Sequence, residues 1–435
     1  MDKTTPIGVT NFHNKHISFG IKNKDRSGHI YCIGKTGVGK STLLLNMAIA
    51  DINSGNGVGI IDPHGDLAET ILDYIPHYRI NDVIYFNAGD SEYPIAFNPL
   101  YNVKKADRYS VASNIVTTLK KIWIDSWGPR LEHVLRNTLL TLTHYPRSSL
   151  LDIIPMLTNY DFRKQILHSV DDFSLHEFWQ KEFEPLSPQL KNEVISPIIN
   201  KVGLFTAHPL LKNILGQQIS KIDIAEIMDT RKIFIVNLSK GSLGEAATQL
   251  LGSFLITQFQ TASLQRAKQS IETRIPYYLF IDEVHSFMTL SFADILSESR
   301  KYGLSLFLTH QFTDQLDEEI LKAILGNVGT IIAFRIGARD ADILKTEFHP
   351  VFNEIDLINL PRYHIYLKLL IDGTTSQPFS AYTLALTHQK QDARAEIIQH
   401  SRKLYADTKG NVEKSLYKRF KTGDSKKAQP NLFSA

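Results

Sequence analysis

The sequence contains a single cysteine, Cys32, among its 435 residues. One thiol cannot form an intramolecular disulfide or supply a cysteine-based zinc site, and such sparing use of cysteine is typical of cytosolic proteins. No apolar run approaches the roughly 18 residues that a membrane span needs. The opening MDKTTPIGVTNFHNKH also lacks the apolar core of a signal peptide. We therefore expect a cytoplasmic chain with no transmembrane segment of its own, which could still dock peripherally at the inner face of the cell membrane through a partner.

A large charge of one sign is also missing. The net charge is +3, with 43% hydrophobic and 21% charged residues, and this composition excludes a mainly disordered chain. The last 49 residues, 387–435, carry eleven Lys and Arg against five Asp and Glu, so the rest of the chain has a net charge of −3. A nucleic acid would therefore need a local positive groove or pore, or this basic tail, which can equally be a solvated terminus.

Short apolar runs rich in β-branched and aromatic residues alternate with helical stretches at both ends of the chain. The predicted strands are 28–34, 57–62, 82–86, 232–238, 277–282, 304–310, 330–336 and 364–370. They are apolar on both faces, as strands of a helix-covered parallel sheet should be. Helices are predicted at 40–53, 244–266, 292–302, 314–325 and 338–347. The alternation predicts an α/β core with a doubly wound, mostly parallel sheet.

Between Phe86 and Lys232 the apolar spacing becomes helical. Leu131, Val134, Leu135, Thr138, Leu139 and Leu142 fall on one helix face, and we expect the seven prolines from 129 to 209 to divide the stretch into short pieces. The pattern predicts an all-α insertion domain. We expect an N-terminal segment at 1–27, a first part of the core at 28–100 and the insertion domain at 101–228. The second part of the core should follow at 229–386, and a basic C-terminal tail at 387–435.

A phosphate-binding motif follows the first predicted strand of the core. The segment 34–41, GKTGVGKS, fits G-x-x-x-x-G-K-[ST] and opens an apolar helix. Glycines let successive backbone N–H groups surround phosphate oxygens, and the helix start adds a partial positive charge. Lys40 is suited to the β- and γ-phosphates, and Ser41 to Mg²⁺. The predicted ATP-binding residues are Gly34, Lys35, Thr36, Gly37, Val38, Gly39, Lys40, Ser41 and Thr42.

A second motif, YYLFIDE at 277–283, is an apolar strand that ends in two carboxylates. We expect Asp282 to hold the Mg²⁺ shell together with Ser41, and Glu283 to polarise an attacking water. Because parallel strands end at one edge, Gln311 at the end of the next strand should lie near Asp282 and could sense the γ-phosphate. The segment 62–66, DPHGD, should reach the same edge and could contact the nucleotide or relay its state; it could equally be a capped turn, since Pro, Gly and Asp are ordinary turn formers.

Arg300 lies at the other end of the strand that precedes Gln311. Seven strand residues span about 20 Å, so Arg300 is too far from its own nucleotide to touch it. We expect it to reach the site of a neighbouring subunit, which implies a ring; the alternative is a surface arginine near a helix C-terminus. Arg335 and Arg339 are weaker candidates for this role.

The chain resembles the FtsK–HerA superfamily of P-loop ATPases in four segments and in their order along the sequence. These segments are GKTGVGKST, DPHGDL, YLFIDEVHSF and SRKYGLSLFLTHQ. The chain looks most like the conjugative type IV coupling proteins (TraG/TraD type) and their soluble relatives. The resemblance covers about 28–370. It implies a RecA-like core, a homohexameric ring and sequence-independent DNA movement through a central pore, with a secretion-channel or relaxosome component as a further partner. Membrane-bound members have N-terminal transmembrane helices; because about 28 residues precede the core here, we expect a soluble relative or one that borrows its membrane anchor from a partner.

Two other classes of function remain. An ATPase that powers protein secretion or remodelling would use the same fold, since fold does not fix substrate. A nucleotide switch or small-molecule kinase is disfavoured because no N-K-x-D guanine reader is present: Asn200-Lys201-Val202-Gly203 and Asn23-Lys24-Asp25-Arg26 both depart from it. ATP hydrolysis coupled to translocation of DNA is the function that the sequence favours.

Overall fold

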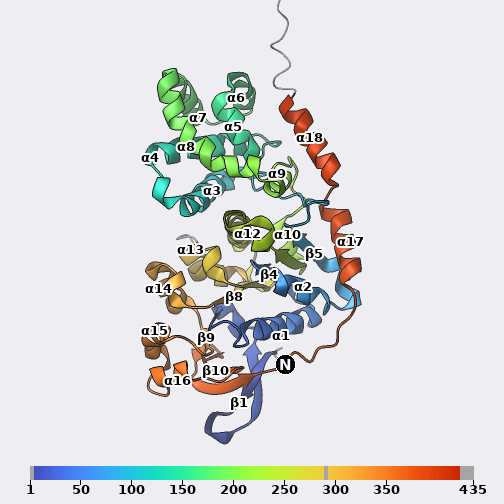
Figure 1. Cartoon of the computed structure of the whole chain (residues 1–435), viewed down its shortest axis with the longest axis vertical. Coiled ribbons are helices and arrows are strands. Elements are labelled where there is room, and N and C mark those ends of the chain that lie inside the picture. Colours follow the sequence, from blue (N-terminus) through green and yellow to red (C-terminus); the bar gives the residue numbers. More distant parts are fainter. Residues whose placement is uncertain (1–3, 289–291, 422–435) are drawn as a thin grey trace, which may run out of the picture. The chain divides into compact units, whose positions relative to one another are not determined.

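The computed structural model describes residues 4–288 and 292–421 (Figure 1). The chain forms two compact units, one of Met1–Asn87 with Asp223–Ser401 and the other of Ala88–Ile222 with Arg402–Ala435. The first holds the sheet and the second is helical. The predicted limits of the insertion were 101 and 228, and part of the predicted tail, 422–435, lies outside the described residues.

The described residues of the first unit form an 11-stranded sheet in the order β2-β1-β13-β10-β9-β3-β8-β7-β4-β6-β5. A separate hairpin joins β11 (Leu370–Ile371) to β12 (Thr374–Thr375). The strands of the large sheet are β1 (Thr4–Thr10), β2 (Ile17–Lys22), β3 (Ile30–Ile33), β4 (Gly57–Asp62), β5 (Val83–Asn87), β6 (Ile233–Asn237), β7 (Tyr277–Ile281), β8 (Leu304–His310), β9 (Thr330–Ala333), β10 (His364–Lys368) and β13 (Phe379–Thr383).

The seven neighbouring strands from β9 to β5 are all parallel. β3 lies between β9 and β8, and β7 follows β8, so β8 separates the strand before the glycine-rich loop from the strand before the acid pair. Ile33 is level with His310, and Leu308 is level with Ile281. The carboxyl ends of β3, β8 and β7 therefore meet at one edge of the sheet.

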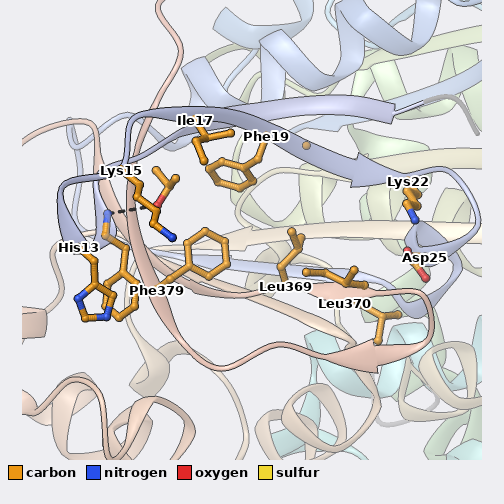
Figure 2. A pocket seen from close by; sticks show the side chains of 13 residues that line it. His13, Lys15, Ile17, Phe19, Lys22, Asp25, Leu369, Leu370 and Phe379 are labelled. Atoms are coloured by element: carbon orange, nitrogen blue, oxygen red, sulfur yellow. Dashed lines mark hydrogen bonds between the residues drawn. The ribbon is translucent and has the colours of Figure 1, made fainter.

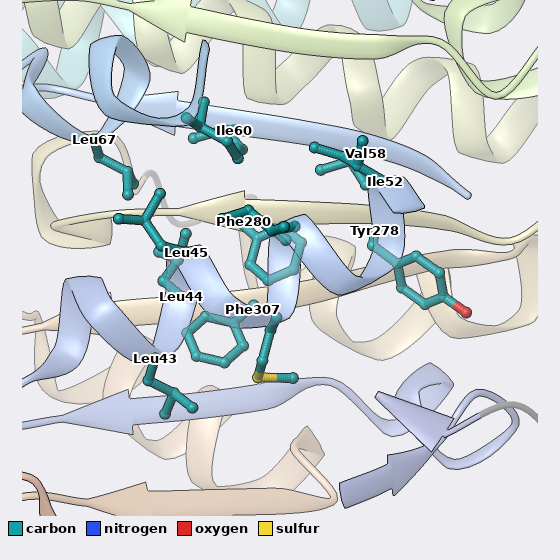
Figure 3. Packing of buried hydrophobic residues seen from close by; sticks show 14 of the residues in the cluster. Leu43, Leu44, Leu45, Ile52, Val58, Ile60, Leu67, Tyr278, Phe280 and Phe307 are labelled. Carbon is teal, nitrogen blue, oxygen red and sulfur yellow. The ribbon is translucent and has the colours of Figure 1, made fainter. Parts of the chain in front are cut away.

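Helices cover both faces of the sheet. The helices of the first unit are α1 (Lys40–Asn53), α2 (Asp66–Leu72), α10 (Ile224–Asp229), α11 (Lys240–Leu243), α12 (Glu245–Gln265), α13 (Phe292–Glu298), α14 (Glu318–Asn327), α15 (Ala338–Phe348) and α16 (Glu354–Ile358). Figure 3 shows leucines of α1 packed against Phe280 and Phe307 of the sheet. On the other face, Phe259 of α12 contacts Phe234 and Tyr277. Burying each such side chain contributes about 2 kcal/mol.

In the second unit, α4 packs against α3, α5, α6, α7 and α8. Its helices are α3 (Arg108–Ile122), α4 (Pro129–Thr143), α5 (Ile153–Thr158), α6 (Tyr160–Leu167), α7 (Phe173–Glu177), α8 (Pro188–Ala207), α9 (Pro209–Leu215) and α18 (Lys409–Lys421), while α17 (Arg394–Tyr405) contains the division at 401/402. The six residues predicted to share one face of α4 are all buried. Among the described residues no single helix is long and apolar enough to cross a membrane; α8 and α9 pass such a test only as a pair bent by 92°.

The prolines do not all end helices. Pro129, Pro188 and Pro209 stand in the first turns of α4, α8 and α9, where their missing N–H costs nothing. Pro197, however, lies inside α8, so the prediction that it divides the stretch was wrong. Its neighbours Val194, Ile195 and Ile198 are buried, and this packing outweighs one lost helical hydrogen bond.

The N-terminal segment belongs to the sheet rather than preceding it. β1 pairs with β13 and with β2, both antiparallel. A buried ion pair joins this segment to α1: Arg26 Nη1 donates to Asp51 Oδ2, and Thr5 Oγ1 donates to Asp51 Oδ1 at 3.1 Å. The guanidinium also stacks 3.8 Å from the centre of the Tyr278 ring. Burial raises the pKa of Asp51, and the Arg26 charge opposes that shift.

The β1–β2 hairpin and the residues around β11 border an apolar groove of about 370 Å³ at the edge of the sheet. Figure 2 shows Ile17, Phe19, Leu369 and Phe379 along it. Phe19 and Phe379 pack edge to face with their ring centres 5.2 Å apart. β2 is the outermost strand, and Lys22 beside the groove pairs with Asp372 at 2.7 Å.

Candidate functional site

The glycine-rich loop joins the end of β3 to the start of α1. Gly37 and Gly39 have φ angles of 74° and 123°, which side chains rarely permit. A Cβ atom on Gly39 would lie 2.8 Å from Cδ1 of Tyr363. The Tyr363 N–H donates to the carbonyl of Val38 at 2.9 Å. Tyr363 therefore packs against the loop and supports it. Position 39 must be glycine because of its φ angle and because a side chain there would overlap with the Tyr363 ring.

Lys40 is the first residue of α1 and is buried. Its ammonium donates to the carbonyl of Gly34 and, at 3.1 Å, to that of Lys35. The loop thus holds the lysine charge over its own backbone, at the start of a 14-residue helix. A fixed cation beside a helix N-terminus favours a bound anion.

Asp282 directly follows β7 and is buried. Burial raises the pKa of its carboxyl group; the hydrogen bond from the Thr309 hydroxyl opposes this shift, and the nearby charge of Glu283 adds to it. Thr309 lies on β8, the strand beside β7. The hydrogen bond from the neighbouring strand therefore favours the charged form of this carboxylate, against the effect of burial.

Glu283 has φ 45° and ψ 53°, a left-handed conformation that is uncommon for residues other than glycine. This turn directs its side chain to the same edge as the loop. Its Oε1 accepts a hydrogen bond from Gln311 Nε2 at 2.8 Å, and its Oε2 lies 3.4 Å from His285 Nδ1. The carboxylate is buried, yet it borders a cleft.

Gln311 follows β8 and links the two motifs. The Thr36 hydroxyl of the glycine-rich loop donates to Gln311 Oε1 at 3.0 Å, while Gln311 Nε2 donates to Glu283. One amide side chain therefore contacts both the phosphate loop and the acid that follows β7.

The turn after β4 reaches the same edge. Asp62 accepts hydrogen bonds from the backbone N–H groups of His64 and Ala68, at 2.8 and 2.9 Å, so it caps its own turn. Burial raises the pKa of this aspartate, and the charge of Asp282 adds to that shift. The segment is therefore a capped turn whose residues Asp62, His64 and Asp66 border the cleft, and its contact with a nucleotide stays a prediction.

These segments enclose a cleft of about 530 Å³. Of the residues predicted from the sequence, Gly34, Lys35 and Val38 lie in the loop without lining the cleft, and nine line it: Thr36, Gly37, Gly39, Lys40, Ser41, Thr42, Asp282, Glu283 and Gln311. The cleft is also lined by Leu45, Asp62, His64, Asp66, Leu67, Thr70 and Tyr363.

The residues fit a nucleotide with Mg²⁺ better than a metal ion alone. In the described part of the chain, no group of three or more His, Cys, Asp or Glu side chains could hold a metal ion. Ser41 and Asp282 both line the cleft, and Mg²⁺ is usually held by one or two protein oxygens together with phosphates and water. The cleft offers such a pair beside a cationic loop.

Arg300 does not join this cluster. It lies in the 3₁₀ turn Ser299–Tyr302, which precedes β8, whereas Gln311 follows that strand. The seven residues of β8 separate the two by roughly 20 Å. Arg300 instead lies close enough to His29, just before β3, for its charge to help lower the pKa of that buried ring.

Four residues that shape the site were not predicted from the sequence. Thr309 and Tyr363 support Asp282 and the loop, and His285 and Gln315 contact Glu283 and Gln311. Thr309 is one of three polar residues in the mainly apolar β8, so its hydroxyl was only a weak signal. The others stand in turns and loops, where polar residues are expected and carry no spacing signal.

A sequence model for the family described as the type IV secretion-system coupling protein DNA-binding domain matches residues 15–345. No curated protein sequence matches the chain.

Several solved structures share the fold. The plasmid coupling protein TrwB in complex with ADP and Mg²⁺ has 17% sequence identity and a TM-score of 0.63, over 86% of this chain and 90% of that one. TrwB with a non-hydrolysable GTP analogue has 16% identity and a TM-score of 0.62, over 86% and 89%. VirB4 of Thermoanaerobacter pseudethanolicus has 14% identity and a TM-score of 0.58, over 88% and 96%. The predicted RecA-like α/β fold is therefore confirmed.

Proposed function

The chain belongs to the family of the type IV secretion-system coupling protein DNA-binding domain, and from that premise we propose that it is an ATP-hydrolysing motor that moves DNA in conjugative or related type IV transfer. The main support for the proposal is that five residues from distant parts of the sequence border the same cleft. They are Lys40, Ser41, Asp282, Glu283 and Gln311. A loop suited to phosphate and a carboxylate suited to water activation have little reason to share a cleft in a protein that only binds nucleotide.

We assign the residues of the cleft as follows. The backbone N–H groups of 34–41 and the Lys40 ammonium bind phosphate oxygens. Ser41 and Asp282 hold Mg²⁺, which when bound neutralises developing phosphate charge. Glu283 orients a water molecule and takes its proton, and Gln311 contacts both this carboxylate and Thr36. The binding of ADP with Mg²⁺ by TrwB, a protein of the same fold, supports this assignment.

DNA as the substrate is supported by the description of the family. Because the residues before 387 carry a net charge of −3, we propose contacts to the phosphate backbone by a few local cations, independent of base sequence. Such binding weakens steeply as salt rises. We further propose that subunits assemble into a homohexameric ring, that a secretion-channel or relaxosome component is a partner, and that the chain works in the cytoplasm or peripherally at the inner face of the membrane.

The first test measures nucleotide binding and ATP turnover in two cleft variants. Lys40→Ala should lose nucleotide binding, because the phosphate charge then lacks its cation. Glu283→Gln should bind ATP as tightly as the unaltered protein and hydrolyse it at least about 100-fold more slowly. Lys15→Ala, a change of the same kind that is remote from the cleft, should leave both properties unchanged. Normal turnover by Glu283→Gln would contradict the assignment of the water-activating residue.

The second test compares ATP turnover with and without single- or double-stranded DNA at low salt. We expect stimulation by DNA of any sequence, falling as salt rises. An ATPase that ignores both kinds of DNA would instead favour the alternative, a motor for protein secretion or remodelling on the same fold.

A further inference from the structure

The two oxygens of the Glu283 carboxylate are linked by a series of polar contacts through Gln311, Gln315 and His285. Gln311 Nε2 donates to Glu283 Oε1 at 2.8 Å, and the backbone N–H of Gln311 donates to Gln315 Oε1 at 3.3 Å. Gln315 Nε2 lies 3.3 Å from His285 Nε2, and His285 Nδ1 lies 3.4 Å from Glu283 Oε2. This series of contacts therefore begins at one oxygen of the carboxylate with a hydrogen bond and returns to the other oxygen with a 3.4 Å contact.

The orientation of the Gln315 amide follows from its partners. Its oxygen accepts from two backbone N–H groups, those of Gln311 and Phe312, each at 3.3 Å. Because an N–H can only donate, the atom that faces them must be the oxygen, and the amide nitrogen then faces His285. Gln315 therefore donates to His285 Nε2.

This donor fixes the tautomer of the histidine. A neutral imidazole has one donor nitrogen and one acceptor nitrogen. Since Nε2 accepts from Gln315, the proton lies on Nδ1, which faces Glu283 Oε2. In that tautomer the Nδ1–H lies on the side of Glu283 Oε2, at an N···O distance of 3.4 Å; this is a polar contact without full hydrogen-bond geometry in the present conformation.

We propose that His285, held by Gln315, is a positioning residue that orients the Glu283 carboxylate for water activation. This inference rests on the proposed hydrolytic function. Glu283 has a left-handed backbone conformation in a turn, so its side chain needs contacts on both oxygens to keep one direction. Gln311 supplies one contact and is tied to the phosphate loop through Thr36; His285 supplies the other.

The kinetic test compares three substitutions of one residue. The amide nitrogen of asparagine can stand where Nδ1 stands, whereas that of glutamine reaches the position of Nε2. We expect His285→Ala and His285→Gln to lower kcat for ATP about tenfold or more, because a misdirected catalytic group costs up to about 100-fold, with no change in KM or nucleotide affinity. His285→Asn should recover most of the loss.

Equal kcat values for the alanine and asparagine variants would overturn the role of the Nδ1 donor. A fall in nucleotide affinity or in thermal stability that accounts for the lost rate would also overturn it, because His285 would then only support the local fold.

The second substitution acts through Gln315. Gln315→Glu places a carboxylate oxygen against His285 Nε2, which draws the proton to that nitrogen and leaves a lone pair facing Glu283. We expect kcat to fall about tenfold while Gln315→Met, which imposes no tautomer, falls less. An unchanged kcat in Gln315→Glu would contradict the proposed relay.

A spectroscopic readout does not depend on turnover. With ¹⁵N-labelled histidine, the resonances lost in His285→Asn identify the ring. We expect its Nδ1 to have the shift of a protonated nitrogen and its Nε2 that of an unprotonated one, with the pattern reversed in Gln315→Glu. The opposite tautomer in the unaltered protein would overturn the inference. If this tautomer is found but the protein hydrolyses no ATP, the proposed function fails and so does the positioning role that rests on it.

Discussion

His29 ties the strand of the phosphate loop to the turn that bears Arg300. It has φ 58° and ψ 160°, a strained combination for a residue with a side chain. Its ring is buried: Nε2 donates to the carbonyl of Leu296 and Nδ1 accepts from the N–H of Leu306, both at 3.1 Å, and Ser299 Oγ lies 3.4 Å from Nε2. The neutral ring thus fixes the ends of α13 and β8 relative to β3.

The buried ring of His29 should make the stability of this region depend on pH. Burial lowers its pKa from 6.5 to about 4. Because the folded-state pKa lies below that of the unfolded chain, this contribution is fully present above pH 6.5 and is lost as the pH falls towards 4. Between pH 7 and pH 5 the loss should reach about 2 kcal/mol.

Hydrogen exchange of the β3 and β8 amides at pH 7 and pH 5, corrected for intrinsic rates, measures this loss. His29→Gln cannot titrate, so its protection should fall by less over the same range. Other buried histidines such as His310 are common to both proteins, so parallel losses would show that His29 is not responsible.

Gly252 allows α12 to lie close to Phe287, which stands in the segment after β7. A Cβ atom there would lie 2.2 Å from the Phe287 ring, so the helix approaches the turn after β7 through the missing side chain. Ser253 Oγ also donates to the carbonyl of Phe287 at 2.9 Å. The helix thus supports the segment that follows the acid pair.

Gly252→Ala should therefore destabilise the protein, although alanine is the better helix former by about 1 kcal/mol. The overlap with the ring should cost 1–3 kcal/mol net, on the order of other overpacking changes. Gly326→Ala in α14, where a Cβ atom would have no neighbour within 4 Å, should be neutral or stabilising. Calorimetric unfolding of both variants tests the contrast; a stabilised Gly252→Ala would contradict the packing argument.

The parallel strands could be predicted because each is buried on both faces and reads as an apolar run, as β7 and β8 do. The antiparallel strands β1, β2 and β13 could not. β1 contains Pro6 and Gly8, β2 is partly exposed, and β13 joins β1 across more than 370 residues. Edge strands carry weaker apolar patterns, and their pairing depends on distant segments.

The candidate site likewise contains residues that could be predicted from the sequence and residues that could not. The loop at 34–41 and the pair Asp282–Glu283 have fixed residue types because phosphate and Mg²⁺ chemistry demand them. His285 and Gln315 have no such pattern, since several residue types can orient a carboxylate. Their roles depend on hydrogen-bond directions, which only coordinates reveal.

At the scale of the proposed ring, we propose that Arg300, which lies roughly 20 Å from its own cleft, acts at the cleft of a neighbouring subunit. Arg300→Ala should lose ATP turnover while retaining a site for nucleotide, and Glu283→Gln should retain Arg300 without the water-activating carboxylate. Mixtures of the two variants would then contain interfaces with both intact groups. We expect turnover to reappear in mixtures and to peak at intermediate ratios; assembled mixtures with no recovery would contradict the action of Arg300 across an interface.

The buried ion pair of Arg26 and Asp51 limits how far the protein can be truncated from its N-terminal side. A fragment that starts at residue 28 keeps every nucleotide motif, yet it removes the only cation paired with Asp51 in the described chain and strips β13 of one neighbour. An uncompensated carboxylate would then remain buried in the last turn of the helix that begins at Lys40. The smallest catalytic fragment worth expressing must therefore retain β1 and Arg26, although neither contains a recognisable motif.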